Sequence, residues 1–191
     1  MAGNIDEFRA RLSGGGARAN QFRITINSPT DIAIGLNARD ASFLCSATNL
    51  PAVTLGEFAL NFRGRQLYIA GDREFADAWT TTFLNDTSFS IRTALERWSN
   101  GINDLELSTG VNDPAGYMAD LEVFQLDRDD NILKAYKFIN AWPQSIGQVD
   151  LSMETTNEIE TFECTWRYQH FLASEVGDSR SSSPIDTSLE G

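Results

Sequence analysis

Residue types that most often serve catalysis, metal binding and cross-linking are scarce in this sequence. The chain of 191 residues has two cysteines and one histidine. Two thiols in a chain of this length do not form a disulfide framework, and with a single histidine they do not supply a zinc site of the usual ligand spacing. Cys45 and Cys164 both lie in apolar, strand-like segments, so we expect buried, reduced thiols.

Long apolar runs and an excess of positive charge are absent too. No run approaches the roughly 20 apolar residues of a membrane span, and the charged N-terminus lacks the apolar segment of a signal peptide. We therefore expect a protein made in a cytoplasm, without membrane insertion. The formal net charge is −12, from 15 basic and 27 acidic residues, so the chain has no general means of holding nucleic acid phosphates. Acidic walls would instead repel DNA, although many soluble proteins are acidic for colloidal reasons.

Three groups of polar residues are compatible with chemistry, and each has a simpler interpretation. His170 ends an apolar strand pattern, and no nucleophile-elbow motif accompanies it. The acidic segment 127–131 lacks the glycine and the final glutamate of an EF-hand and is typical of a hairpin turn. Glutamates between 154 and 163 fit the outer side of a strand better than an acid–base pair. We therefore expect no enzymatic activity, no cofactor and no metal site.

Alternation and helical spacing predict a mainly β chain with one central and one terminal helix. The helices are expected over 4–12 and 87–100, with Gly101 as the stop of the second. A tight turn is expected at Gly71-Asp72, where Gly71 would permit positive φ. Strands are expected over 22–26, 43–47, 54–62, 66–70, 79–84, 119–126, 133–139, 149–153 and 158–171.

Side-chain periodicity also predicts which residues are buried. The predicted central helix has Ile91, Ala94, Leu95 and Trp98 on one face, and the last strand has Phe162, Cys164, Trp166 and Tyr168 on one face. Strands that follow one another through short turns favour an antiparallel β-sandwich or barrel with a flanking helix, an α+β arrangement. We divide the chain into an N-terminal arm with a short helix and a glycine hinge (1–19), a β domain (20–172) and a flexible Ser-rich tail (173–191).

Short motifs are spread along the chain from Asn20 to Tyr168. No single motif identifies a family, but their order and spacing together are specific. They are Asn20-Gln21-Phe22, Cys45 to Pro51, Phe62 to Arg65, Ala70 to Phe75, Trp79, Phe83, Asn85-Asp86, Trp98, Tyr136, Trp142-Pro143, Ile146-Gly147 and the segment 157–163. Together they resemble the tail tube proteins of contractile-tailed bacteriophages, to which pyocin and type VI secretion inner-tube proteins are related in fold.

This resemblance implies a fold of two packed antiparallel sheets and an architectural function. In the family, subunits form a hexameric ring with a continuous inner β-barrel, and rings stack into a hollow tube inside a contractile sheath. The implied partners are further copies of the chain, the tail sheath protein, a baseplate or tube initiator and a tail terminator. Genomic DNA would be cargo that passes through, without sequence-specific binding. The implied location is the virion tail, assembled in the host bacterial cytoplasm.

Subunit contacts are expected in the loop 51–65 and the turn 71–73. We place these residues at interfaces as a hypothesis: Pro51, Glu57, Arg63, Arg65, Gly71, Asp72 and Arg73. The segments 28–40 and 173–191 are longer than the family pattern needs, which leaves open a main tube subunit or a specialised initiator or terminator. Other readings also remain open: an inner tube of a type VI or pyocin-like system, a monomeric ligand-binding β-barrel and, with least support, a hydrolase.

Overall fold

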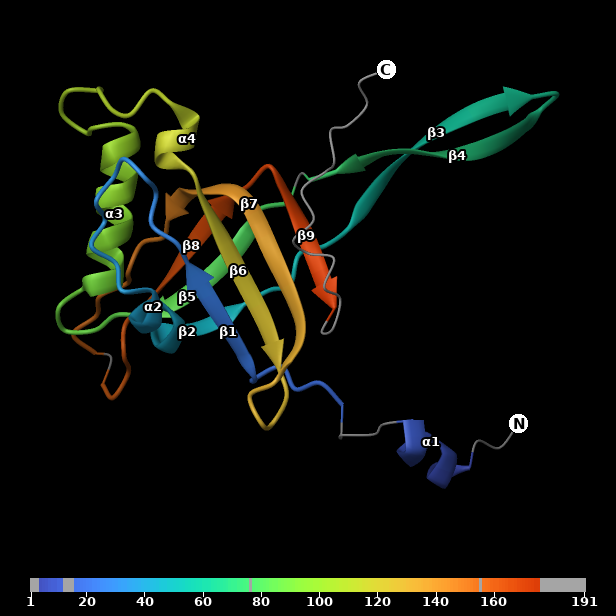
Figure 1. The fold of residues 1–191 in the computed structure, drawn as a ribbon, viewed down its shortest axis with the longest axis horizontal. Helices are drawn as coiled ribbons and strands as arrows, with labels where there is room; N and C mark the ends of the chain where they lie inside the picture. The colour runs from blue at the N-terminus through green and yellow to red at the C-terminus, as the bar shows by residue number, and fades with distance from the viewer. Residues whose placement is uncertain (1–3, 12–15, 76, 155, 176–191) are drawn as a thin grey trace, which may run out of the picture.

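Antiparallel strands dominate the computed structural model, which describes residues 4–11, 16–75, 77–154 and 156–175 (Figure 1). The described residues form nine strands and four helices. The helices are α1 (Ile5–Arg11), α2 (Ala38–Leu44), α3 (Ser90–Ile102) and α4 (Pro114–Tyr117). The strands are β1 (Phe22–Ile26), β2 (Cys45–Thr48), β3 (Thr54–Phe62), β4 (Arg65–Glu74), β5 (Trp79–Leu84), β6 (Ala119–Leu126), β7 (Ile132–Ile146), β8 (Thr161–Arg167) and β9 (His170–Glu175).

The long strand β7 joins two halves of the main sheet. Its first part pairs with β6 on one side and β9 on the other, and its second part pairs with β8. The strand order is therefore β1-β6-β7-β8-β5-β2, with β9 attached to β7, and every pairing is antiparallel. Between the two parts, Asn140 has a left-handed φ of 54°. The predicted mainly β, antiparallel fold class is confirmed.

Aromatic side chains from both halves of the sheet fill the core. Trp79 of β5 stacks on Phe138 of β7 with ring centroids 4.5 Å apart, and both are buried. Alternate residues of β5 are buried, namely Trp79, Thr81 and Phe83, and the predicted apolar face of the last strand is buried too. On α3 the buried residues are the four that helical spacing predicts, Ile91, Ala94, Leu95 and Trp98.

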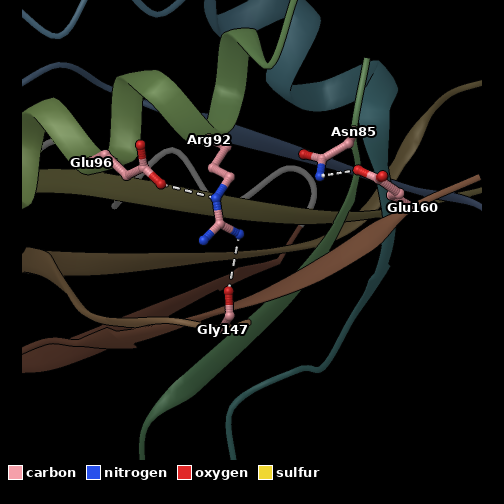
Figure 2. Close-up of polar contacts among 5 residues, drawn as sticks. All are labelled: Asn85, Arg92, Glu96, Gly147 and Glu160. Atoms are coloured by element: carbon pink, nitrogen blue, oxygen red, sulfur yellow. Dashed lines mark hydrogen bonds and ion pairs between the residues drawn. The ribbon is translucent and has the colours of Figure 1, made fainter. Parts of the chain in front are cut away.

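Polar contacts at its first turns attach α3 to the connection between β7 and β8 (Figure 2). The Arg92 Nε lies 2.9 Å from a Glu96 carboxylate oxygen, and its Nη1 donates to the Gly147 carbonyl at 3.0 Å. Close by, the Asn85 amide donates to the Glu160 carboxylate at 3.3 Å. The guanidinium group therefore bridges the helix and the loop that leads into β8.

Helix α2 is a feature that the sequence reading missed. Residues 28–40 were expected as a polar loop or weak hairpin and 43–47 as a strand, but a helix begins at Ala38 and the strand begins only at Cys45. Asn37 caps the helix, since its side-chain oxygen accepts from the Arg39 amide at 3.0 Å. Ala41 is wholly buried. Leu44 of the same helix is partly buried against the core, so α2 packs through only two of its residues and has no long apolar periodicity.

The predicted stop of the central helix is wrong. Gly101 lies inside α3, and the Asn103 amide closes the helix by donating to the Ser99 carbonyl at 3.0 Å. A Cβ at Gly101 would lie 2.7 Å from a side-chain carbon of Ile32. The glycine therefore allows the helix to approach Ile32 and does not end it.

The C-terminal strand prediction is also wrong in part. The expected strand over 158–171 divides into β8 and β9, and β9 turns back to pair with β7, where Ala173 lies opposite Tyr136. Residues 149–153 form no strand. Ordered structure thus passes the expected domain boundary at residue 172. The rest of the expected tail, from 176 onwards, and two glycines of the expected hinge, Gly14 and Gly15, lie outside the described residues.

Candidate assembly interface

The hairpin β3–β4 forms a separate two-stranded sheet that extends away from the rest of the molecule (Figure 1). Within the part of the chain that the structure describes, its two strands pair only with each other, from Thr54 opposite Glu74 to Phe62 opposite Arg65. Every side chain of the hairpin is exposed or half-buried, and none is in the core. An isolated two-stranded ribbon is marginally stable in water, so this one is suited to contacts with another molecule.

The tight turn of the hairpin lies at Arg63-Gly64, between the two predicted strands 54–62 and 66–70, whereas the separate tight turn expected at Gly71-Asp72 is wrong. Arg63 and Gly64 both have positive φ, 48° and 81°, which is the geometry of a type I′ turn. Such turns match the twist of the flanking strands. Gly71 and Asp72 instead lie within β4.

Gly71 serves close backbone approach rather than positive φ. A β-bulge separates Leu55 and Glu57 on β3, and a Cβ at Gly71 would lie 3.2 Å from the backbone of Gly56. Gly71 is not among the glycines of the described chain that have a positive φ. The two glycines therefore let the strands come together at the bulge, near the base of the hairpin.

The predicted interface residues do not form one cluster. Arg63 and Arg65 are at the tip of the hairpin, whereas Gly71, Asp72 and Arg73 are near its base. Glu57 lies between them, opposite Ala70, and Pro51 precedes β3 in a half-buried position. The structure therefore places six of the seven on one ribbon, but at opposite ends of it.

An apolar face of the hairpin is the feature that the interface prediction missed. Directly opposed residues of an antiparallel pair share a face, so the register places large apolar side chains together on one side. They are Phe58, Leu60, Phe62, Leu67 and Ile69, which we call the apolar stripe. Their exposed fractions run from 37% for Ile69 to 68% for Phe62. Asn61, Gln66 and Tyr68 lie on the opposite face, so the ribbon is amphipathic, a pattern visible in the alternation of the sequence.

A second candidate surface lies where the main sheet stays open. Among the described residues, β1 pairs only with β6 and β2 pairs only with β5, so within that part of the chain each strand has one free edge. Between these edges lies a groove of about 1100 Å³, which we call the edge groove. Helix α2 borders it, and its lining includes Phe22, Ile24, Phe43, Ser46 and Asp130.

The residues considered for chemistry have structural roles. His170 packs edge-on against Phe75 at a centroid distance of 6.4 Å. The Asp127 carboxylate accepts from the Asn131 side chain and from the amides of Asn131 and Asp129, as a turn residue does. These hydrogen bonds lower the pKa of Asp127, and the bond from the Asn131 side chain has the largest effect. Among the described residues, no three histidine, cysteine, aspartate or glutamate side chains are arranged to hold a metal ion.

Both cysteines are free and buried, as expected. Burial raises the pKa of Cys45 to about 12 and raises the pKa of Cys164 as well. The described helices include none long and apolar enough to span a membrane.

Comparison with known proteins identifies a structural protein. A family model described as phage tail tube protein matches residues 17–174, and the chain therefore belongs to the phage tail tube protein family. The tail tube protein of Serratia phage KSP90 is 34% identical over 166 residues, covering 86% of this chain and 93% of that protein. Tail tube protein gp19 of Enterobacteria phage T4 is 33% identical over 161 residues, covering 84% and 93%. The predicted resemblance to tail tube proteins, a structural rather than enzymatic function and a place in the virion tail are confirmed.

Solved structures share the fold. One is from an extracellular contractile injection system in a sheath–tube complex, with a TM-score of 0.56 and 14% identity over 87% of this chain and 97% of that chain. Another is from the baseplate of the anti-feeding prophage, with a TM-score of 0.55 and 17% identity over 85% and 97%. The phage relatives favour the phage tail tube over the alternatives of a type VI or pyocin inner tube and a monomeric binder.

Proposed function

We propose that six copies of this chain close into a ring and that the rings stack into the hollow tube of a contractile tail. Family membership supports a tube subunit, and one structure with the same fold comes from a six-fold symmetrised assembly. In the ring, strands of neighbouring copies join into a continuous inner β-barrel. The tube lies inside the tail sheath, grows from a baseplate or initiator and ends at a terminator. It conducts genomic DNA as cargo.

The amphipathic hairpin is the observation that carries this proposal. The apolar stripe on it is exposed in a single copy, and a contiguous exposed apolar face marks an interaction site. The free edges of β1 and β2 support the same conclusion, because unpaired strand edges are an aggregation hazard unless an assembly covers them. The predicted interface residues, from Pro51 to Arg73, belong to or adjoin this hairpin.

The net charge of −12 suits a conduit for DNA. Phosphates bind to Lys and Arg and are repelled by carboxylates. A lumen with an excess of carboxylates lets the duplex slide without sticking. The expected outcome is that purified tubes retain no double-stranded DNA at physiological salt.

Negative-stain electron microscopy of the purified chain across a concentration series tests the assembly. Six-fold rings or hollow tubes with a central channel are the expected result. Small featureless particles at every concentration would favour a monomeric binder or a specialist at one end of the tube. Arg73→Ala tests the interface assignment at the hairpin base, and tubes formed as readily as by the wild type would contradict it.

A further inference from the structure

Helix α1 is a short amphipathic element that lies apart from both sheets (Figure 1). None of its seven residues is buried, and its large apolar side chains, Ile5 and Phe8, are 71% and 65% exposed. The structure shows this helix in an open position. We propose that in a single copy α1 also folds back onto the edge groove of its own chain, and that it leaves the groove when copies join into a ring. The effect on assembly rests on the proposed function, whereas the docking of the helix does not.

The sequence of α1 favours a helix locally but leaves it in need of a surface. The Asn4 side chain accepts from the Asp6 amide at 3.2 Å, and Arg11 lies 3.5 Å from the Glu7 carboxylate one turn away. Such exposed contacts contribute little, and an isolated helix shorter than about 12 residues is marginal in water. Ile5 and Phe8 are three positions apart and so share a face. Burying that face against the protein stabilises the helix.

The edge groove has a lining and a size that suit this helix. Phe43 of α2 is 73% exposed there, and Phe22 and Ile24 of β1 line the same space. The groove has a volume of about 1100 Å³. A helix of seven residues is about 10 Å long and about 10 Å wide, which corresponds to a volume on the order of 800 Å³. The groove therefore accommodates one short helix with its apolar face down.

Chain connectivity makes α1 of the same copy the occupant. Ala19 and Asn20 themselves line the groove, so the arm joins the body at the site where it is proposed to dock. From Arg11 to Ala19 the chain has eight residue steps, a reach of at most about 28 Å. A tether of this length gives the helix a high effective concentration at the groove, so a weak contact is sufficient to fill it.

Charge fixes the direction of the helix in the groove. The first turn of α1 is acidic and its last turn is basic. The tethered last turn enters beside Leu126, whose amide donates to the Gln21 carbonyl at 2.9 Å, and Asp130 lines the same part of the fold. Helix α2, which carries Arg39, lies beside β1 and away from the β6–β7 turn (Figure 1). The basic turn therefore meets Asp130 while the acidic turn meets Arg39.

Docking of α1 and closure of a ring exclude each other. The groove lies between the free edges of β1 and β2, and covering a strand edge with a helix prevents another chain from pairing with it. The proposed ring requires strands of neighbouring copies to join. The docked arm therefore lowers the fraction of chains that are competent to assemble. It protects single copies from edge-to-edge association until a growing tube or an initiator displaces it.

Reactivity of a cysteine in the groove measures docking in single copies. Ser46 is exposed and lines the groove, and the two native thiols are buried. In dilute full-length Ser46→Cys, adding Phe8→Asp should raise the alkylation rate at least about fivefold, because the charge expels the helix from the apolar lining. Ala10→Asp is the matched control, since helical spacing puts Ala10 on the opposite face, and it should leave the rate unchanged. Equal rates in the three chains would overturn the proposal.

A cross-link tests the effect on assembly. In a dilute chain with Asp6→Cys and Arg39→Cys, oxidised glutathione should close a disulfide within one copy. The bonded chain should form no rings or tubes in electron micrographs until a reductant is added. The control with Ala10→Cys in place of Asp6→Cys should stay reduced and assemble.

Two outcomes of the cross-link would overturn the proposal. One is a bond between two copies instead of within one, which would assign the groove to the arm of another copy. The other is a bonded chain that assembles as readily as the reduced one. If the wild type forms no rings or tubes, the proposed function fails instead, and the alkylation rates still decide whether α1 docks.

Discussion

The indole nitrogen of Trp166 donates a hydrogen bond of 2.9 Å to the hydroxyl oxygen of Thr81, and both residues are wholly buried. Thr81 is on β5 and Trp166 on the neighbouring β8. The bond satisfies the N–H of a tryptophan that packs against Trp79 and Trp98. One hydroxyl group therefore permits an aromatic cluster at the centre of the β fold.

Thr81→Val should destabilise the folded chain by about 1–3 kcal/mol, because it leaves the buried Trp166 N–H without an acceptor at nearly unchanged volume. Chemical denaturation followed by tryptophan fluorescence measures the change. Thr82→Val is the matched control, since Thr82 is on the other face of the same strand. Equal losses in the two variants would show that the hydrogen bond contributes nothing specific.

Gly101→Ala should destabilise the chain by about 1–3 kcal/mol through overpacking, even though alanine favours a helix by about 1 kcal/mol. The added Cβ would lie 2.7 Å from Ile32. In an Ile32→Ala background the same substitution should become neutral or stabilising, and a double-mutant cycle measures this coupling. Additive effects would mean that the contact with Ile32 is not the cause.

The turn between β6 and β7 should be sensitive to acid. Hydrogen bonds to the Asp127 carboxylate lower its pKa below the ordinary value of 3.8. The stabilisation is therefore fully present above that value and is lost as pH falls through the lower, folded-state pKa. The wild type should melt at a higher temperature than Asp127→Asn at pH 7, and the difference should vanish in strong acid.

Asp129→Asn serves as the control for that comparison, because no hydrogen bond from the described turn residues reaches the Asp129 carboxylate. Its difference from the wild type should be small and should not follow the same pH dependence. A difference between the wild type and Asp127→Asn that stays constant with pH would contradict the role of the carboxylate.

Both thiols should be unreactive in the folded chain at pH 8. Burial raises the pKa of Cys45 to about 12 and also raises the pKa of Cys164. The thiolate form, which is the one that reacts with disulfide reagents, is therefore almost absent at pH 8. Titration with a chromogenic disulfide reagent should detect two thiols in denaturant and none within minutes without it. Rapid reaction of the folded protein would show that the core opens.

Local patterns predicted the elements whose residues alternate cleanly. β5 and β6 have the bounds expected from sequence, and the buried face of α3 follows from its helical spacing. These predictions hold because burial on one face imposes a period of two on strands and 3.6 on helices. Family resemblance added the tail tube assignment, which composition alone did not support.

Long-range contacts decided the rest. Pro143 lies within β7 at a bulge against β8, where a proline is tolerated, and only that pairing shows that the strand continues beyond Ile139. Likewise, Gly71 resembles a turn residue in the sequence, but its approach to Gly56 across the hairpin requires the glycine. The local sequence around Pro143 or Gly71 is compatible with a turn or with a strand, and the pairing with the neighbouring strand decides between the two.

The sequence by itself therefore determined the class of fold, the core-facing residues and the family, because these depend on periodicity and on the order of motifs along the chain. Tertiary structure alone decided that Gly71 lies inside a strand, that the hairpin exposes an apolar stripe, and that β1 and β2 leave a groove between them. Those features depend on register and on which strands remain unpaired. Both are properties of contacts between distant segments, which no local pattern encodes.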